Sequence, residues 1–212
     1  MSAFTYDVTY EESRNRLTVA FRFILAIPHI IVAQVWGYLA QILGVIQWFI
    51  ILFTGKRNEG IWKLQQTWLY YYSRAFGYVS LLFDEYPAFG TDPGSPPVRS
   101  DISFEEGANR LSSALRFLWI IPAAIIGFFI AIGAVVVWVI SWFAILFTGK
   151  HPRGMWEFQL KAFRFTLQVQ SYALLMTDVY PKFGEGVPVA AVSTPPPPGS
   201  FVPPPPPPAP AV

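Results

Sequence analysis

Two long runs of apolar residues, at positions 17–53 and 111–147, set the pattern of the whole chain. Each run carries one formal charge, Arg22 in the first and Arg116 in the second. About 20 consecutive apolar residues are enough to cross the ~30 Å hydrocarbon core of a bilayer, so both runs predict membrane helices. Both are much longer than one crossing requires, and the patterns within them suggest how the excess length is used.

The second run belongs to a copy of the first half of the chain. Residues 7–90 align with residues 101–184 without a gap, and about 33 of the 84 pairs are identical. The matches include prolines and polar residues, which two unrelated membrane helices would not share. The chain therefore divides into repeat 1 (residues 1–90), a linker rich in Pro, Gly and Ser (91–100), repeat 2 (101–184) and a proline-rich tail (185–212).

The start of each run is amphipathic. In repeat 1, Leu17, Phe21 and Ile24 share one helix face, while Arg22 lies on the opposite face. This pattern favours a helix at the lipid–water boundary with its arginine toward water, and an ordinary packed helix is the alternative.

Each run also contains a proline at a matched position, Pro28 and Pro122, and these are candidate kinks. An unbroken helix over residues 17–53 would be roughly 55 Å long at ~1.5 Å per residue, far more than the bilayer core. Dividing each run at its proline predicts an interfacial helix before it and a transmembrane helix after it, at about residues 27–53 and 121–147. The sequence Thr-Gly-Lys then ends each span with a glycine stop.

A third segment follows in each repeat, at residues 61–83 and 155–177. It is rich in Trp, Tyr and Phe and carries a stripe of basic residues, each of which would cost about 2.5–3.5 kcal/mol at the bilayer centre. We therefore expect an amphipathic helix at the interface rather than another crossing. The candidate interface residues are the basic side chains of these patterns: Arg22, Arg116, Lys63, Arg74, Lys161 and Arg164.

These patterns predict an all-α integral membrane protein with the lipid bilayer as its partner. Three topologies fit: one crossing per repeat, two crossings per repeat, or a hairpin that dips into the membrane and returns. One crossing per repeat is expected, because submerged cations argue against four crossings and the runs lack a central turn. Lys56 and Lys150 would then emerge on opposite sides of the membrane.

The composition excludes several other classes of protein. Hydrophobic residues make up 53% of the chain and charged residues 13%, and the net charge of +2 gives no basis for nucleic-acid binding. Without cysteine, disulfides and thiolate sites are excluded. His29 and His151 have no partners at metal-ligand spacing. We predict no metal, no cofactor and no catalytic residue, and hence no enzyme. The N-terminus does not look like a cleavable signal, so the first run is expected to remain as an anchor.

The tail at residues 185–212 contains runs of proline that cannot form a helix or a sheet. It is expected to be extended and disordered, either as a spacer or as a ligand for the aromatic groove of a protein partner. A homo-oligomer is also left open by the sequence.

Several motifs resemble a bacterial membrane family catalogued as domain of unknown function 4389. The resemblance covers both repeats and excludes the tail. In repeat 1 it is carried by Asn15, Arg16, Leu17, Arg22, Phe23, Ile27, Pro28, His29, residues 48–56, Gly60, Trp62, Asp84, Tyr86, Pro87 and Phe89. Repeat 2 departs from the pattern at Ala123, which stands where repeat 1 has His29. The resemblance implies a bacterial integral membrane protein and brings no activity, cofactor or catalytic residue.

As function we expect a non-enzymatic membrane scaffold or accessory protein in the bacterial cell membrane, crossing it more than once. The alternative is a small transporter or channel subunit in which Arg22, Arg116, Lys63 and Arg74 face a polar path.

Overall fold

The computed structural model describes residues 3–89 and 98–184, and every structural statement below concerns these residues. They form five helices and two strands in the order β1 (Thr5–Val8), α1 (Arg16–Thr54), α2 (Glu59–Val79), β2 (Val98–Asp101), α3 (Arg110–Ala114), α4 (Arg116–Thr148) and α5 (Arg153–Ala173). The expectation for the proline-rich tail lies outside the described residues, as does most of the predicted linker.

The described chain is mostly helical, as predicted, but it is not purely α-helical, because β1 and β2 pair as an antiparallel ribbon. Thr5 lies opposite Asp101, and Val8 lies opposite Val98. The ribbon also corrects the linker prediction, because residues 98–100 belong to β2. Alternate side chains of β1 are buried, with Tyr6 and Val8 inward and Asp7 outward, which is the period-two pattern of a half-buried strand.

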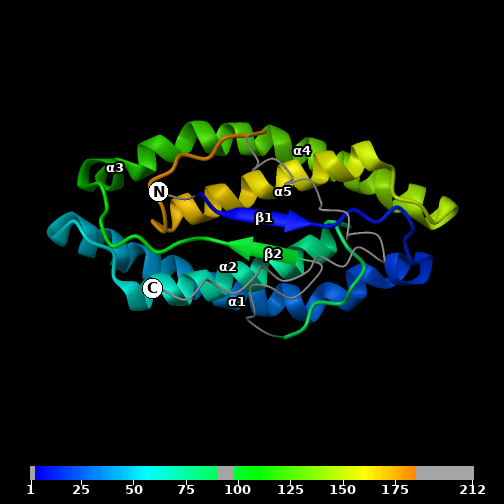
Figure 1. Ribbon diagram of the computed structural model, residues 1–212, viewed down its shortest axis with the longest axis horizontal. Helices are drawn as coiled ribbons and strands as arrows, with labels where there is room; N and C mark the ends of the chain where they lie inside the picture. The colour runs from blue at the N-terminus through cyan, green and yellow to red at the C-terminus, as the bar shows by residue number, and fades with distance from the viewer. Residues whose placement is uncertain (1–2, 90–97, 185–212) are drawn as a thin grey trace, which may run out of the picture.

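The two long helices run antiparallel along the longest axis of the molecule, one at each edge of the view in Figure 1, with α2 and α5 between them. α1 packs on α2 and α4 packs on α5, so each repeat forms a helical hairpin. The ribbon lies across α2 and α5, near the middle of the long axis (Figure 1). The strand of each repeat contacts the hairpin of the other: β1 packs on α5, and β2 packs on α2.

The repeats are therefore related by an approximate two-fold axis, and equivalent hydrogen bonds recur at both ends. The indole of Trp48 donates to the carbonyl of Ser113 at 2.9 Å, and its counterpart Trp142 donates to the carbonyl of Val19 at 3.1 Å. The first bond joins the end of α1 to α3, and the second joins the end of α4 to the start of α1, so both ends of the molecule are tied across the repeats.

The helix ends follow the local sequence. The Asn15 side chain accepts hydrogen bonds from the backbone N–H groups of Leu17 and Thr18, and Asn109 caps α3 in the same way. Gly55 and Gly149 end the long helices at φ 74°, a left-handed conformation that suits glycine. The predicted glycine stops are confirmed.

The division of each run at its proline is wrong. Pro28 lies inside the continuous helix α1, and Pro122 lies inside α4. Within the described residues, the only interruption of a long run is in repeat 2, at Leu115 between α3 and α4. One proline removes a single backbone donor from a helix. Buried contacts on both sides of Pro28, at Arg22 and Ala33, hold α1 together across the missing hydrogen bond.

The third segments are helices as predicted, but the aromatic side chains of α2 do not form a belt at the membrane interface. Trp62, Trp68 and Tyr78 are 3%, 4% and 0% exposed and form the protein core. Small residues on the facing side of α1 allow this close packing. They are Ala26, Ala33, Gly37, Ala40 and Gly44.

Candidate functional site

The outward sides of α1 and α4 carry many exposed apolar side chains, which are here together called the apolar face. Side chains at both ends of both helices are exposed, including Leu17 (69%), Phe53 (78%) and Phe147 (73%). Only 6% of the most apolar stretch of α4 is buried, whereas the core helix of a soluble protein is mostly buried. Soluble monomers rarely expose contiguous apolar patches above a few hundred Å². Both helices are long and apolar enough to span a membrane.

The amphipathic starts of the runs face the opposite way from the prediction. Phe21 is 53% exposed on the apolar face, whereas Arg22 and Arg116 are 2% and 3% exposed and point into the protein. The interpretation that these arginines face water is wrong. Periodicity gave two faces, but it could not tell which face meets the rest of the protein.

The ribbon side of the molecule is polar. Asp7, Arg99 and Asp101 are exposed along the ribbon. Arg164 of α5 donates from Nε to the carbonyl of Tyr6 at 2.7 Å, and its Nη2 lies 2.8 Å from Asp7 Oδ1. This ion pair ties α5 to β1.

Each half of the molecule contains one ion cluster, in which buried arginines surround a partly buried aspartate. The first ion cluster consists of Asp84 with Arg14 and Arg22. Arg22 pairs directly with Asp84, and Arg14 Nη1 lies 3.6 Å from Asp84 Oδ1. The Arg22 guanidinium also donates to the carbonyls of Tyr78 and Phe83, at 2.9 and 3.0 Å.

The second ion cluster consists of Asp178 with Arg57 and Arg116. Arg57 Nη2 lies 2.8 Å from Asp178 Oδ2, and Arg116 Nη2 lies 2.7 Å from Asp178 Oδ1. Burial alone would raise the pKa of Asp178, but the hydrogen bond and charge of Arg57 hold it below its usual value. The carboxylate therefore stays charged and joins α4 to the start of α2.

The turns after α2 and α5 direct backbone carbonyls at these arginines. Leu81 and Leu175 adopt left-handed conformations, at φ 63° and 61°. Arg14 Nη2 donates to the carbonyl of Leu82 at 2.8 Å, and Arg57 Nε donates to that of Leu175 at 2.7 Å. Strained backbone at two matched positions thus serves the ion clusters.

His151 is fully buried beside the first ion cluster. Its backbone N–H donates to the carbonyl of Glu12 at 2.8 Å, and its carbonyl accepts from the Tyr10 hydroxyl at 2.7 Å. Burial, together with the charges of Arg14 and Arg22, lowers the pKa of the imidazole to about 4. The ring is therefore neutral at pH 7.

The remaining predicted interface residues do not gather at one site. Lys63 is exposed and pairs with Glu59 at 2.7 Å, Lys161 is exposed on α5, and Arg74 is buried. Sequence reasoning missed Asp84 and Asp178, although both repeats retain this aspartate before the Tyr-Pro turn. An aspartate kept at the same position in both repeats was the signal in the sequence that could have identified these two site residues.

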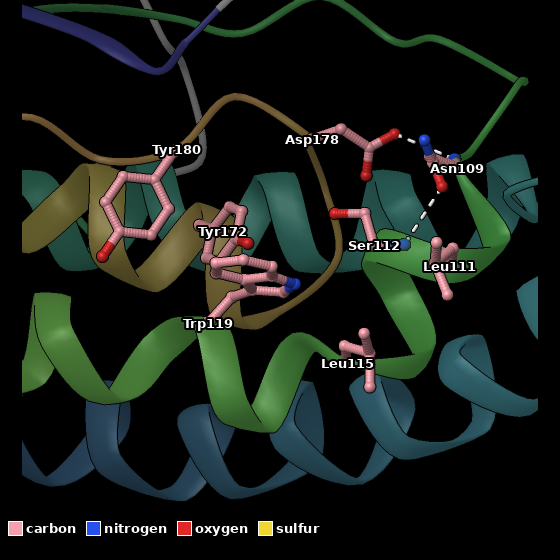
Figure 2. Close-up of a pocket in the computed structure, with 8 residues that line it drawn as sticks. All are labelled: Asn109, Leu111, Ser112, Leu115, Trp119, Tyr172, Asp178 and Tyr180. Atoms are coloured by element: carbon pink, nitrogen blue, oxygen red, sulfur yellow. Dashed lines mark hydrogen bonds between the residues drawn. The ribbon is translucent and has the colours of Figure 1, made fainter.

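A shallow pocket of about 320 Å³ lies beside the second ion cluster (Figure 2). Its polar end holds Asp178, which accepts from the backbone N–H of Asn109 at 3.2 Å. Its other walls include Leu115 and Trp119, which are 37% and 53% exposed on the apolar face. The pocket thus connects the apolar face with a hydrogen-bonded polar end.

Among the described residues, no group of three His, Asp or Glu side chains is placed to hold a metal ion. His29 is fully buried in α1. Its Nδ1 lies 2.8 Å from the Tyr71 hydroxyl, and its ring stacks on Phe89 with centroids 4.1 Å apart. These contacts account for the histidine as a packed helix residue.

Comparison with known proteins gives one match. The model of the family described as Domain of unknown function (DUF4389) matches residues 16–90 and 110–184. No curated protein and no solved structure matches the chain.

Proposed function

The chain belongs to the DUF4389 family, in two tandem copies, and from this premise we propose that it is a non-enzymatic membrane scaffold or accessory protein that lies flat in one leaflet. The apolar face enters the lipid, and the β1–β2 ribbon faces water. The membrane is the bacterial cell membrane that the resemblance implies.

The position of the ribbon is the observation that supports this orientation best. If α1 and α4 crossed the bilayer along their length, the exposed charges of Asp7, Arg99 and Asp101 would lie near the bilayer centre. Each submerged charge costs about 2.5–3.5 kcal/mol on insertion scales. A flat orientation instead places all three in water while the apolar face stays in lipid.

The length of the apolar face supports the same orientation. Exposed apolar side chains continue along α1 for about 55 Å at ~1.5 Å per residue, against a bilayer core of about 30 Å. In the flat orientation the long helices lie parallel to the membrane surface, so the length of the apolar face does not have to equal the bilayer thickness. The charged ends, with Lys56 2.9 Å from Glu106 and Lys150 2.9 Å from Glu12, can then reach the same membrane surface.

A scaffold is favoured over a transporter because Arg22 and Arg116 are committed to the ion clusters. Both are almost fully buried, and both contact aspartates and carbonyls rather than a polar path. Their contacts hold the turn after each hairpin against the long helix. This architecture supports the proposal of a lipid-bound platform.

Single cysteines test the orientation cleanly because the native chain has none. We would place them at Asn58 and Pro152, near opposite ends of the molecule, and at Arg99 on the ribbon, and label intact and permeabilised cells with a membrane-impermeant maleimide. The flat orientation requires N58C, P152C and R99C to share one side. V35C, on the apolar face, is the matched control and should stay unlabelled because maleimide coupling needs water.

The multi-pass alternative gives the opposite pattern. Lys56 and Lys150 do lie at opposite ends of the long helices, as one crossing per repeat requires. If several copies turned their ribbons toward a shared aqueous path, the chain would act as a channel subunit. N58C and P152C would then react from opposite sides, and that result would overturn the flat scaffold.

A further inference from the structure

The two ion clusters are built on backbone positions that match closely between the repeats. The backbone N–H of Arg14 donates to the carbonyl of Gly149 at 2.9 Å, and that of its counterpart Ala108 donates to Gly55 at 3.0 Å. The second matched pair is His151, bonded to Glu12 at 2.8 Å, and Arg57, bonded to Glu106 at 2.7 Å. Beside each aspartate there are therefore two such backbone positions, one in the same repeat as the aspartate and one in the other repeat.

The side chains at these positions are not the same in the two clusters. In the first cluster the repeat's own position supplies Arg14, while the position from the other repeat is the neutral His151. In the second cluster the arrangement is reversed. The position in the same repeat as Asp178 holds Ala108, and the other repeat supplies Arg57. With Arg22 or Arg116 added, each aspartate has two arginines.

We propose that Arg14, His151, Ala108 and Arg57 form a pairing code that makes repeat 1 and repeat 2 specific partners for each other. The surface involved is the one between the repeats, and the partner it fits is a repeat of the opposite kind. The code concerns assembly and does not depend on how the protein is oriented in the membrane.

Counting the charges in a like-with-like assembly shows why the code is specific. Two copies of repeat 1 would bring Arg14 and Arg57 together with Arg22 at each aspartate, burying three cations against one anion. A buried charge without a partner is strongly destabilising. The third guanidinium would also need space that His151 fills at 0% exposure.

Two copies of repeat 2 would have the reverse defect. Each aspartate would have Arg116, with the histidine and the alanine at the other two positions. The carbonyls of Leu175, Glu105 and Gly107, which now accept from Arg57 at 2.7, 3.2 and 2.6 Å, would lose that donor. Only pairing of unlike repeats gives two arginines at both aspartates.

The experiment moves an arginine from one position of a cluster to the other, within the full-length chain. R14A removes a cation from the first cluster, H151R adds one, and the R14A/H151R double variant moves the arginine to the other position. In detergent, each single variant should lower the melting temperature by about 10 °C, because a buried ion group loses its balance. The double variant should return to within about 3 °C of the native protein.

The second cluster supplies an independent test. R57H should be destabilised, and the R57H/A108R double variant should recover. R14A/H151Q and R57H/A108M are the matched controls, because they fill space without restoring the cation, and neither should recover. If a variant yields little protein, the yield of monodisperse protein replaces the melting temperature. The proposal is overturned if R14A or H151R melts at the same temperature as the native protein. It is also overturned if either double variant melts no higher than the less stable of its two single variants.

Discussion

The indole ring of Trp68 packs directly on the backbone of Gly37. A Cβ atom added at Gly37 would lie 3.3 Å from both Cζ2 and Nε1 of the ring, while Nε1 donates to the carbonyl of Ala33 at 2.9 Å. Trp68 is 4% exposed, so the ring cannot move into solvent. This contact sets the distance between α1 and α2 at the middle of the long helix.

Replacing Gly37 with leucine should therefore separate the two helices. Overpacking a dense core costs typically 1–3 kcal/mol, and a misplaced Trp68 would also lose its hydrogen bond. We expect G37L to lower the melting temperature in detergent by several degrees. V35L, two residues away on the apolar face, is the control and should leave it unchanged. Equal melting temperatures for the two variants would mean that the contact does not limit the packing.

Breaking the second ion cluster should be more damaging. D178N leaves Arg57 and Arg116 buried without their carboxylate, and removing one partner of a buried pair costs about 3–5 kcal/mol. The loss should appear as reduced stability to denaturant or heat. E59Q removes the partner of the exposed Lys63 instead, and its effect should stay below about 1 kcal/mol. A D178N protein as stable as E59Q would contradict the role of the cluster.

Stability should fall as the pH drops below about 6.5. His151 has a pKa of about 4 in the folded protein, because burial disfavours the charged imidazole, against about 6.5 when unfolded. The unfolded state binds the proton first, so stability is present above pH 6.5 and is lost progressively toward pH 4. The difference corresponds to about 3 kcal/mol. Melting temperatures measured from pH 7.5 to 4.5 should show this slope.

The H151Q variant isolates the imidazole in that experiment. Glutamine is neutral throughout the range, so the slope between pH 6.5 and 4 should shrink markedly. The lowered pKa of Asp178 also removes stability on acidification, but mainly below about pH 5, where an unfolded aspartate begins to bind its proton. An unchanged slope in H151Q would assign the pH dependence to other groups.

Charges placed on the apolar face should weaken membrane association without disturbing the core. Ile132 and Val136 are 49% and 53% exposed on α4, so I132D/V136D submerges two carboxylates at a cost of up to about 2.5–3.5 kcal/mol each. We expect more of this variant to be extracted by alkaline carbonate. K161E, on the exposed side of α5, is the control and should remain in the membrane. Equal extraction would mean that α4 does not face lipid.

The sequence by itself determined the duplication, the helical nature of the two long apolar runs and of the third segments, and the glycine ends of the long helices. These features depend on composition, spacing and local caps, which are properties of neighbouring residues. Membership of the family likewise follows from the sequence alone, through motifs such as those at Trp62 and Tyr86.

Only the tertiary structure decided which side of each helix faces outward. Arg22 and Phe21 are adjacent, and an amphipathic pattern places them on different faces without saying which one meets protein. The answer depends on Asp84, which lies 62 residues away and reaches Arg22 only after the α1–α2 hairpin closes. The β1–β2 ribbon depends on contacts between the repeats. So does the use of Arg14 as the second arginine of the first ion cluster and of Arg57 as that of the second. Such pairings arise from the two-fold arrangement of the whole chain, so no local pattern carries them.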